Sequence, residues 1–123
     1  MDKLKILVID DKEVIGDLFK FTLGYKGHEI KVVDNAASAL ESIKKNFYDI
    51  IFLDIVMPGK DGCEILKEIR DFSPSIPVVM MTGYSLDEKQ KSAERMGAAL
   101  CLRKPFEMDD VKRVIKQTIG KDV

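Results

Sequence analysis

The 123-residue sequence contains few of the residues that indicate a metal cluster, a disulfide scaffold or a membrane segment. Its two cysteines, Cys63 and Cys101, are far apart and match no metal-binding or redox spacing, and its single histidine is His28. The apolar run from Ile6 to Ile9 is too short for a signal peptide or a membrane span and is followed by two acids. We therefore expect a cytoplasmic protein whose cysteines are thiols.

The sequence also lacks an excess of either charge, with 20 Lys and Arg residues against 21 Asp and Glu residues. This balance gives no overall basic field, so neither nucleic acid nor a membrane is an expected partner. The segment DDKEVIGD after the first apolar run has no glycine-rich phosphate loop, which argues against nucleotide binding. Hydrophobic residues make up 46% of the chain and charged residues 33%, so we expect one folded domain over residues 1–123.

Short apolar runs alternate along the chain with segments of helical periodicity. Several of the runs are continuously apolar, as is typical of strands covered on both faces. The expected strands are 5–10, 29–33, 49–54, 76–81 and 98–102. The segments after them predict helices, of which the one at 85–96 has the thinnest apolar stripe. The order (βα)5 predicts a doubly wound α/β fold, in which a five-stranded parallel sheet carries helices on both faces.

Polar side chains stand at the carboxyl ends of these strands, where ligands bind in parallel α/β sheets. Asp10 and Asp11 end the first strand, Asp54 ends the third, Thr82 follows the fourth and Lys104 follows the fifth. Taken singly, each residue has a simpler explanation as a helix cap, a turn residue, a strand end or a surface lysine. Capping does not explain three acids arriving from two neighbouring strands, so we expect one shared site.

The expected cluster of three carboxylates requires a cation, because like charges raise one another's pKa unless something neutralises them. Oxygen ligands completed by water favour Mg²⁺. Together with the Lys104 ammonium and the Thr82 hydroxyl, such an ion would form a receptor for a phosphoryl group. Asp54 lies at the centre of the group on a rigid strand and is the best candidate for a nucleophile that forms an acyl phosphate.

The motifs ILVIDD, DIIFLDIVMPGKDG, VVMMTGY and LRKPF, in this order and spacing, resemble the receiver domain of two-component response regulators over essentially the whole chain. The resemblance implies strand order 2-1-3-4-5, as in chemotaxis receivers. It also implies phosphorelay signalling, in which Asp54 accepts a phosphoryl group from the phosphohistidine of a sensor histidine kinase or phosphotransfer protein. The reaction would depend on Mg²⁺ or Mn²⁺. Beyond catalysing its own phosphorylation and dephosphorylation, the chain would not be an enzyme.

The resemblance assigns further roles to individual residues. The implied metal ligands are Asp10, Asp11, Asp54 and the backbone carbonyl of Val56. Thr82 would hydrogen-bond the phosphoryl group and move on activation, and Lys104 would pair with a phosphoryl oxygen. The bond from Lys104 to Pro105 would be cis, an isomer that proline makes accessible.

Cys101 departs from the family, because an aromatic residue usually stands at this position and turns inward on activation. Cysteine lacks the size and the hydroxyl for that coupling with Thr82, and a small buried apolar residue is the simpler interpretation. Tyr84 is an alternative partner. The signal would reach an effector or output domain through the face formed by the helix at 85–96, the strand at 98–102 and the C-terminal helix, and this face could also serve a dimer.

Two other functions stay open on the sequence. A degenerate receiver could act as a docking module without phosphorylation, although Asp10, Asp11, Asp54, Thr82 and Lys104 are all present. A phosphatase of the haloacid-dehalogenase type also uses an aspartyl phosphate, but that family places a second Asp where Lys12 stands. His28 precedes the second strand at the opposite edge of the sheet, and we expect it on the surface.

Overall fold

The computed structural model describes residues 3–57, 59, 61–83, 97–98 and 100–123. Five parallel strands form one sheet in the order β2-β1-β3-β4-β5, which confirms the expected fold class and strand order. The strands are β1 (Lys5–Ile9), β2 (Glu29–Val33), β3 (Ile50–Asp54), β4 (Val78–Thr82) and β5 (Leu100–Arg103). All five coincide with runs expected from the sequence, with small differences at their ends.

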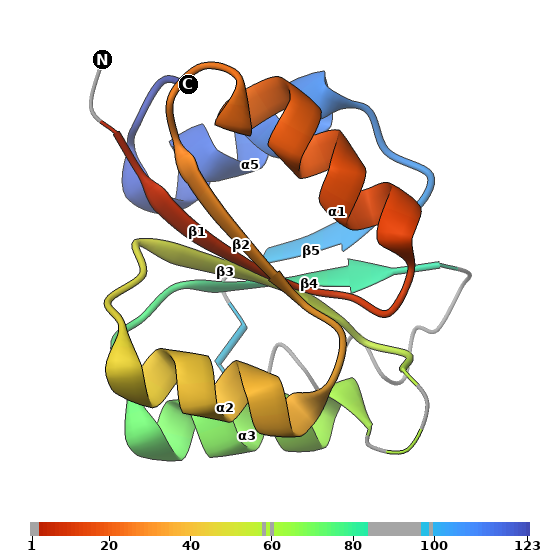
Figure 1. The fold of residues 1–123 in the computed structure, drawn as a ribbon, viewed down its shortest axis with the longest axis vertical. Helices are drawn as coiled ribbons and strands as arrows, with labels where there is room; N and C mark the ends of the chain where they lie inside the picture. The colour runs from red at the N-terminus through yellow and green to blue at the C-terminus, as the bar shows by residue number, and fades with distance from the viewer. Residues whose placement is uncertain (1–2, 58, 60, 84–96, 99) are drawn as a thin grey trace.

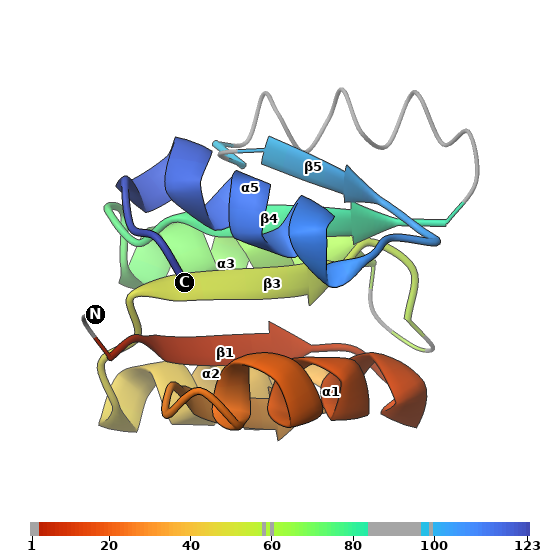
Figure 2. The same ribbon diagram turned by 90° about the horizontal axis from the view of Figure 1, so that it is seen from above.

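Helices cover both faces of the sheet. The helices are α1 (Glu13–Phe19), its π-helical continuation η1 (Lys20–Gly24), α2 (Ala36–Lys45), α3 (Gly62–Phe72) and α5 (Met108–Ile119). Figures 1 and 2 show α1 and α5 on one face and α2 and α3 on the other. The expected helix at 85–96 and Tyr84 lie outside the described residues. Among the helices that the structure describes, none has the length and apolarity needed to cross a membrane.

The sheet divides the core into two apolar layers, because successive residues of a strand point to opposite faces. Leu53 and Met80 belong to the layer beneath α2 and α3, whereas Phe52 and Val79 belong to the layer beneath α1 and α5. In that second layer the rings of Phe52 and Phe19 pack with centroids 4.9 Å apart. Strands β3 and β4 are buried throughout, which explains why their sequences are continuously apolar.

The chain after β3 packs tightly against the start of α3. A Cβ atom added at Gly62 would lie 2.6 Å from the backbone oxygens of Asp54 and Ile55, so a side chain does not fit there. Asp61 caps α3, and its carboxylate accepts a hydrogen bond from the Cys63 N–H at 2.8 Å. These contacts fix the carboxyl end of β3, where Asp54 stands.

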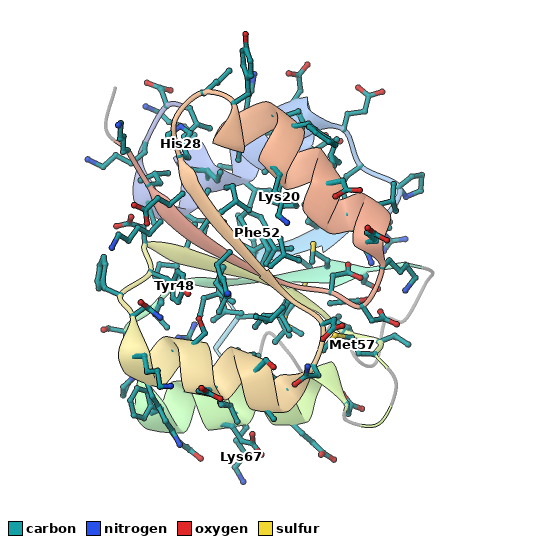
Figure 3. All side chains as sticks on the ribbon, viewed as in Figure 1. Lys20, His28, Tyr48, Phe52, Met57 and Lys67 are labelled. Atoms are coloured by element: carbon teal, nitrogen blue, oxygen red, sulfur yellow. The ribbon has the colours of Figure 1, made fainter. Side chains whose placement is uncertain are left out.

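The expectation of a surface position for His28 is wrong, since the side chain is only 4% exposed. The residue does lie at the expected edge of the sheet, and Figure 3 shows it at the end opposite to Met57. Parallel pairing of Lys5 with Glu29 brings Leu4 beside His28, and the Leu4 N–H donates to His28 Nδ1 at 3.0 Å. The burial comes from a chain segment 24 positions away, which local sequence does not reveal.

Candidate functional site

The register of β1 and β3 brings the acids of these strands together. Ile9 pairs with Leu53, so Asp10 and Asp54 follow neighbouring residues on adjacent strands. Both side chains are buried, each 2% exposed, whereas Asp11 lies on the exposed rim. One carboxylate oxygen from each of the three acids lies within 4.8 Å of the others. The structure thus assembles the carboxylate cluster expected from the sequence.

Local backbone hydrogen bonds orient the two buried acids. Asp10 Oδ1 accepts the Lys12 N–H at 2.8 Å, and Asp54 Oδ1 accepts the Val56 N–H at 3.1 Å. The simpler explanation of Asp11 as a helix cap fails, because Lys12 and not Asp11 holds the N-cap position of α1. The second oxygen of each buried acid therefore faces the space that the cluster shares.

Lys104 reaches these second oxygens from the loop after β5. Its Nζ lies 2.8 Å from Asp10 Oδ2 and 3.3 Å from Asp54 Oδ2, and the side chain is 14% exposed. The Lys104 N–H donates to the Thr82 carbonyl at 2.6 Å, and the bond to Pro105 is cis as expected. Lys104 is therefore a partly buried ion partner of two carboxylates, and the interpretation as a solvated surface lysine is excluded.

Asp54 Oδ2 is the most exceptional atom of the site. It is buried, and among the residues that the structure describes it has no hydrogen-bond partner, although two ammonium groups lie within ion-pair distance. Burial raises the pKa of Asp54, and the Asp10 charge raises it further, while the Val56 N–H and the two lysines act in the opposite direction. An unsatisfied oxygen among carboxylates fits a hard divalent cation or an electrophile such as phosphorus.

Sequence reasoning did not identify Lys12 as a member of the site. Its Nζ lies 3.6 Å from Asp11 Oδ1 and 3.7 Å from Asp54 Oδ2, so it provides a second ammonium within ion-pair distance of the cluster. The available signal was a lysine directly after two acids at a strand end.

The remaining predicted residues lie at different distances from the cluster. Thr82 is buried at the end of β4 and adjoins Lys104 through the backbone, while Val56 is exposed beside Asp54. Cys101 lies further back on β5, where it pairs with Met80 and packs against the layer beneath α2 and α3. This packing agrees with a small apolar role for Cys101, and its part in a switch stays a prediction.

A 2-1-3-4-5 parallel sheet with an acidic cluster and a lysine at its carboxyl edge defines a doubly wound α/β protein of the chemotaxis-receiver type. Residues 6–116 match the family model of the response regulator receiver domain. The chain belongs to this family.

The sporulation initiation phosphotransferase F of Bacillus subtilis (strain 168) is 35% identical over 114 residues, which are 92% of this chain and 91% of that protein. The transcriptional regulatory protein ZraR of Klebsiella oxytoca is 33% identical over 119 residues, 97% of this chain but 27% of that protein. The crystal structure of the receiver domain of NtrX from Brucella abortus has a TM-score of 0.87 at 37% identity, covering 95% of this chain and 99% of that one. The chain therefore spans about a quarter of the length of ZraR.

Proposed function

We propose that the chain is a single phosphorelay receiver domain whose Asp54 accepts a phosphoryl group from the phosphohistidine of a sensor histidine kinase or phosphotransfer protein. The observation that carries this proposal is Asp54 Oδ2, a buried carboxylate oxygen that lies within ion-pair distance of two ammonium groups and has no hydrogen bond from the described residues. Such an oxygen is oriented and only weakly solvated, which suits it to nucleophilic attack. Membership of the receiver family supports the same reaction.

The transfer forms a bond between Asp54 Oδ2 and phosphorus and breaks the phosphorus–nitrogen bond of the donor, whose electron pair stays on the imidazole. Lys104 neutralises negative charge on the phosphoryl oxygens, and the Thr82 hydroxyl hydrogen-bonds one of them. Receiver domains are generally Mg²⁺-dependent. Here Asp10, Asp11, Asp54 and the Val56 carbonyl would hold Mg²⁺ or Mn²⁺, which neutralises charge on the phosphoryl group when bound. Hydrolysis of the acyl phosphate by water then resets the domain.

Phosphorylation changes the contacts that Thr82 and Lys104 make, because the new oxygens accept hydrogen bonds in only one arrangement of their loops. The Lys104 N–H already bonds the Thr82 carbonyl, so a shift of one loop affects the other. We infer that the change reaches an effector or output domain through β5 and α5, with Cys101 in place of the usual aromatic. We place the protein in the cytoplasm, where the thiols of Cys63 and Cys101 stay reduced.

A hollow beside Lys104 suits a protein donor. It has a volume of about 570 Å³ and is lined mainly by apolar side chains, among them Val14, Ile15, Leu18 and Phe106. Lys104 lines the same hollow, so a protein seated there would reach the phosphoacceptor without crossing other parts of the surface. An apolar surface next to a reactive group is typical of a docking site.

Intact-mass spectrometry after incubation with acetyl phosphate and Mg²⁺ tests the reaction. We expect a labile adduct of one phosphoryl group that is lost in Asp54→Asn and when Mg²⁺ is omitted. A folded protein that forms no adduct would instead be a docking module. Rapid turnover of varied phosphate esters would indicate a phosphatase.

A second arm separates chemistry from docking. Val14→Glu places a charge in the hollow at a residue that is already exposed, so the fold should be retained. With any histidine kinase that labels the wild-type chain, we expect transfer to Val14→Glu to slow about tenfold. Labelling by acetyl phosphate should be unchanged. Phe47→Glu is the matched control, because Phe47 is equally exposed but does not line the hollow.

A further inference from the structure

We propose that the Lys12 ammonium competes with the divalent metal ion for Asp11 and Asp54, and thereby sets the metal affinity of the site. The inference rests on the proposed function, since it concerns the metal of the phosphoacceptor site. It adds a residue to which neither the sequence motifs nor the receiver resemblance assigns a role.

The position of Lys12 is the first argument. Its Nζ lies 3.6 Å from Asp11 Oδ1 and 3.7 Å from Asp54 Oδ2, and these are two of the three acids that could hold a metal. Its own N–H donates to Asp10 Oδ1, so the backbone of Lys12 is anchored beside the third acid. A cation at this place and a metal ion on the same oxygens repel each other, and one must give way.

The charge balance of the cluster is the second argument. Three carboxylates face the ammonium groups of Lys12 and Lys104, which leaves a single net negative charge. Without Lys12 the cluster would carry two negative charges and would attract a divalent cation more strongly. Lys104 Nζ lies 2.8 Å from Asp10 Oδ2, and no ion pair joins Lys12 to Asp10 among the described residues, so Lys104 keeps this partner when Lys12 is replaced.

The exposure of Lys12 is the third argument. Its side chain is 56% exposed, so the ammonium can move into water when a metal ion binds. Lys12 is thus a counter-ion that a metal ion can displace from Asp11 and Asp54, and not a permanent ion-pair partner of these acids.

The test is a metal titration without any phosphodonor. We would measure Mg²⁺ binding by isothermal titration calorimetry, and Mn²⁺ binding from the electron paramagnetic resonance signal of the free ion. For Lys12→Gln, we expect the dissociation constant of Mg²⁺ to fall about fivefold, because ion pairs of a half-exposed lysine are weak. Lys12→Arg keeps the charge and should stay within about twofold of the wild type.

Lys45→Gln is the matched control, because it removes the same charge from an exposed ion pair with Glu41 on α2. It should leave the Mg²⁺ affinity unchanged, which excludes an effect of net charge alone. Equal Mg²⁺ affinities of Lys12→Gln and Lys45→Gln would overturn the inference. So would weaker Mg²⁺ binding by Lys12→Gln than by the wild type, or the absence of Mg²⁺ binding in both variants. The proposed function would fail differently, through metal binding in the wild type without an acetyl phosphate adduct.

Discussion

At the carboxyl end of the sheet, Asp10 and Asp54 are buried as charged groups beside Lys104, whereas at the amino end His28 is buried next to a backbone N–H. Also at the amino end, the hydroxyls of Ser42 and Tyr48 share a hydrogen bond. Burial raises the pKa of Asp54 and lowers the pKa of His28, because in both cases it disfavours the charged form.

The two ends therefore contribute to stability with opposite signs. His28 Nδ1 satisfies the Leu4 N–H, which would otherwise be a buried donor without a partner. The carboxyl end holds three acids against two lysines, so repulsion remains after all ion pairs have formed. This comparison indicates that the polar groups of the amino end stabilise the fold. Those of the carboxyl end lower the free energy of unfolding, but they form a site that can bind a cation and a phosphoryl group.

The largest effect is expected from removing the His28 side chain at the amino end. His28→Ala leaves the Leu4 N–H buried without its acceptor and opens a cavity, so we expect the free energy of unfolding to fall by about 2–3 kcal/mol. Urea denaturation at pH 7.5 measures this change. At urea concentrations below its unfolding transition, His28→Ala should still be phosphorylated by acetyl phosphate. A loss under about 0.5 kcal/mol would show that water replaces the imidazole at this position.

Removing the central charge of the carboxyl end should have a smaller effect in the opposite direction. Because its pKa is raised, Asp54 favours the folded state only when protonated, and this contribution is lost as pH rises through the folded pKa. At pH 7, Asp54→Asn should therefore raise the free energy of unfolding by about 1–2 kcal/mol while the Asp10–Lys104 pair stays intact.

Urea denaturation in EDTA tests this expectation for Asp54. Asp71→Asn, at an exposed position on α3, is the control and should change stability by less than about 0.5 kcal/mol. If Asp54→Asn were as stable as the control, the lysines would already compensate the third carboxylate completely. A destabilised Asp54→Asn would mean that the ion pairs outweigh the repulsion.

The smallest effect is expected in the pH dependence of stability that His28 causes at the amino end. Burial, and then the Lys26 charge, lower the pKa of His28 below its ordinary value of 6.5. The unfolded chain therefore takes up a proton first, and stability is lost as pH falls from 6.5 towards the lowered folded pKa. The slope from this one group cannot exceed about 1.4 kcal/mol per pH unit.

Comparison with His28→Asn isolates this contribution, because asparagine offers an acceptor but does not titrate in this range. We expect the free energies of unfolding of the two proteins to converge as pH falls from 8 to 5. Parallel pH profiles would show that His28 titrates alike in the folded and unfolded chains.

The sequence predicted most of the fold, because the alternation of apolar runs and helical stripes is a local property of the chain. It also predicted the meeting of Asp10, Asp11 and Asp54, since strand ends of a parallel sheet share one edge. It did not predict that Lys12 belongs to the site, and it wrongly predicted a surface position for His28. The direction of a long flexible side chain and the burial of a loop residue depend on which distant segment packs beside them.

The order of strands and helices follows from the sequence by itself, because the periodicity of apolar side chains distinguishes a strand from a helix. Once the strands are located, the residue types at their ends can be read directly from the sequence. The tertiary structure alone decided which charges pair. Asp10 and Lys104 stand 94 positions apart and meet at 2.8 Å only because β1 and β5 end at the same edge of the sheet. Electrostatic energy depends on distances in space, and the folded chain sets those distances.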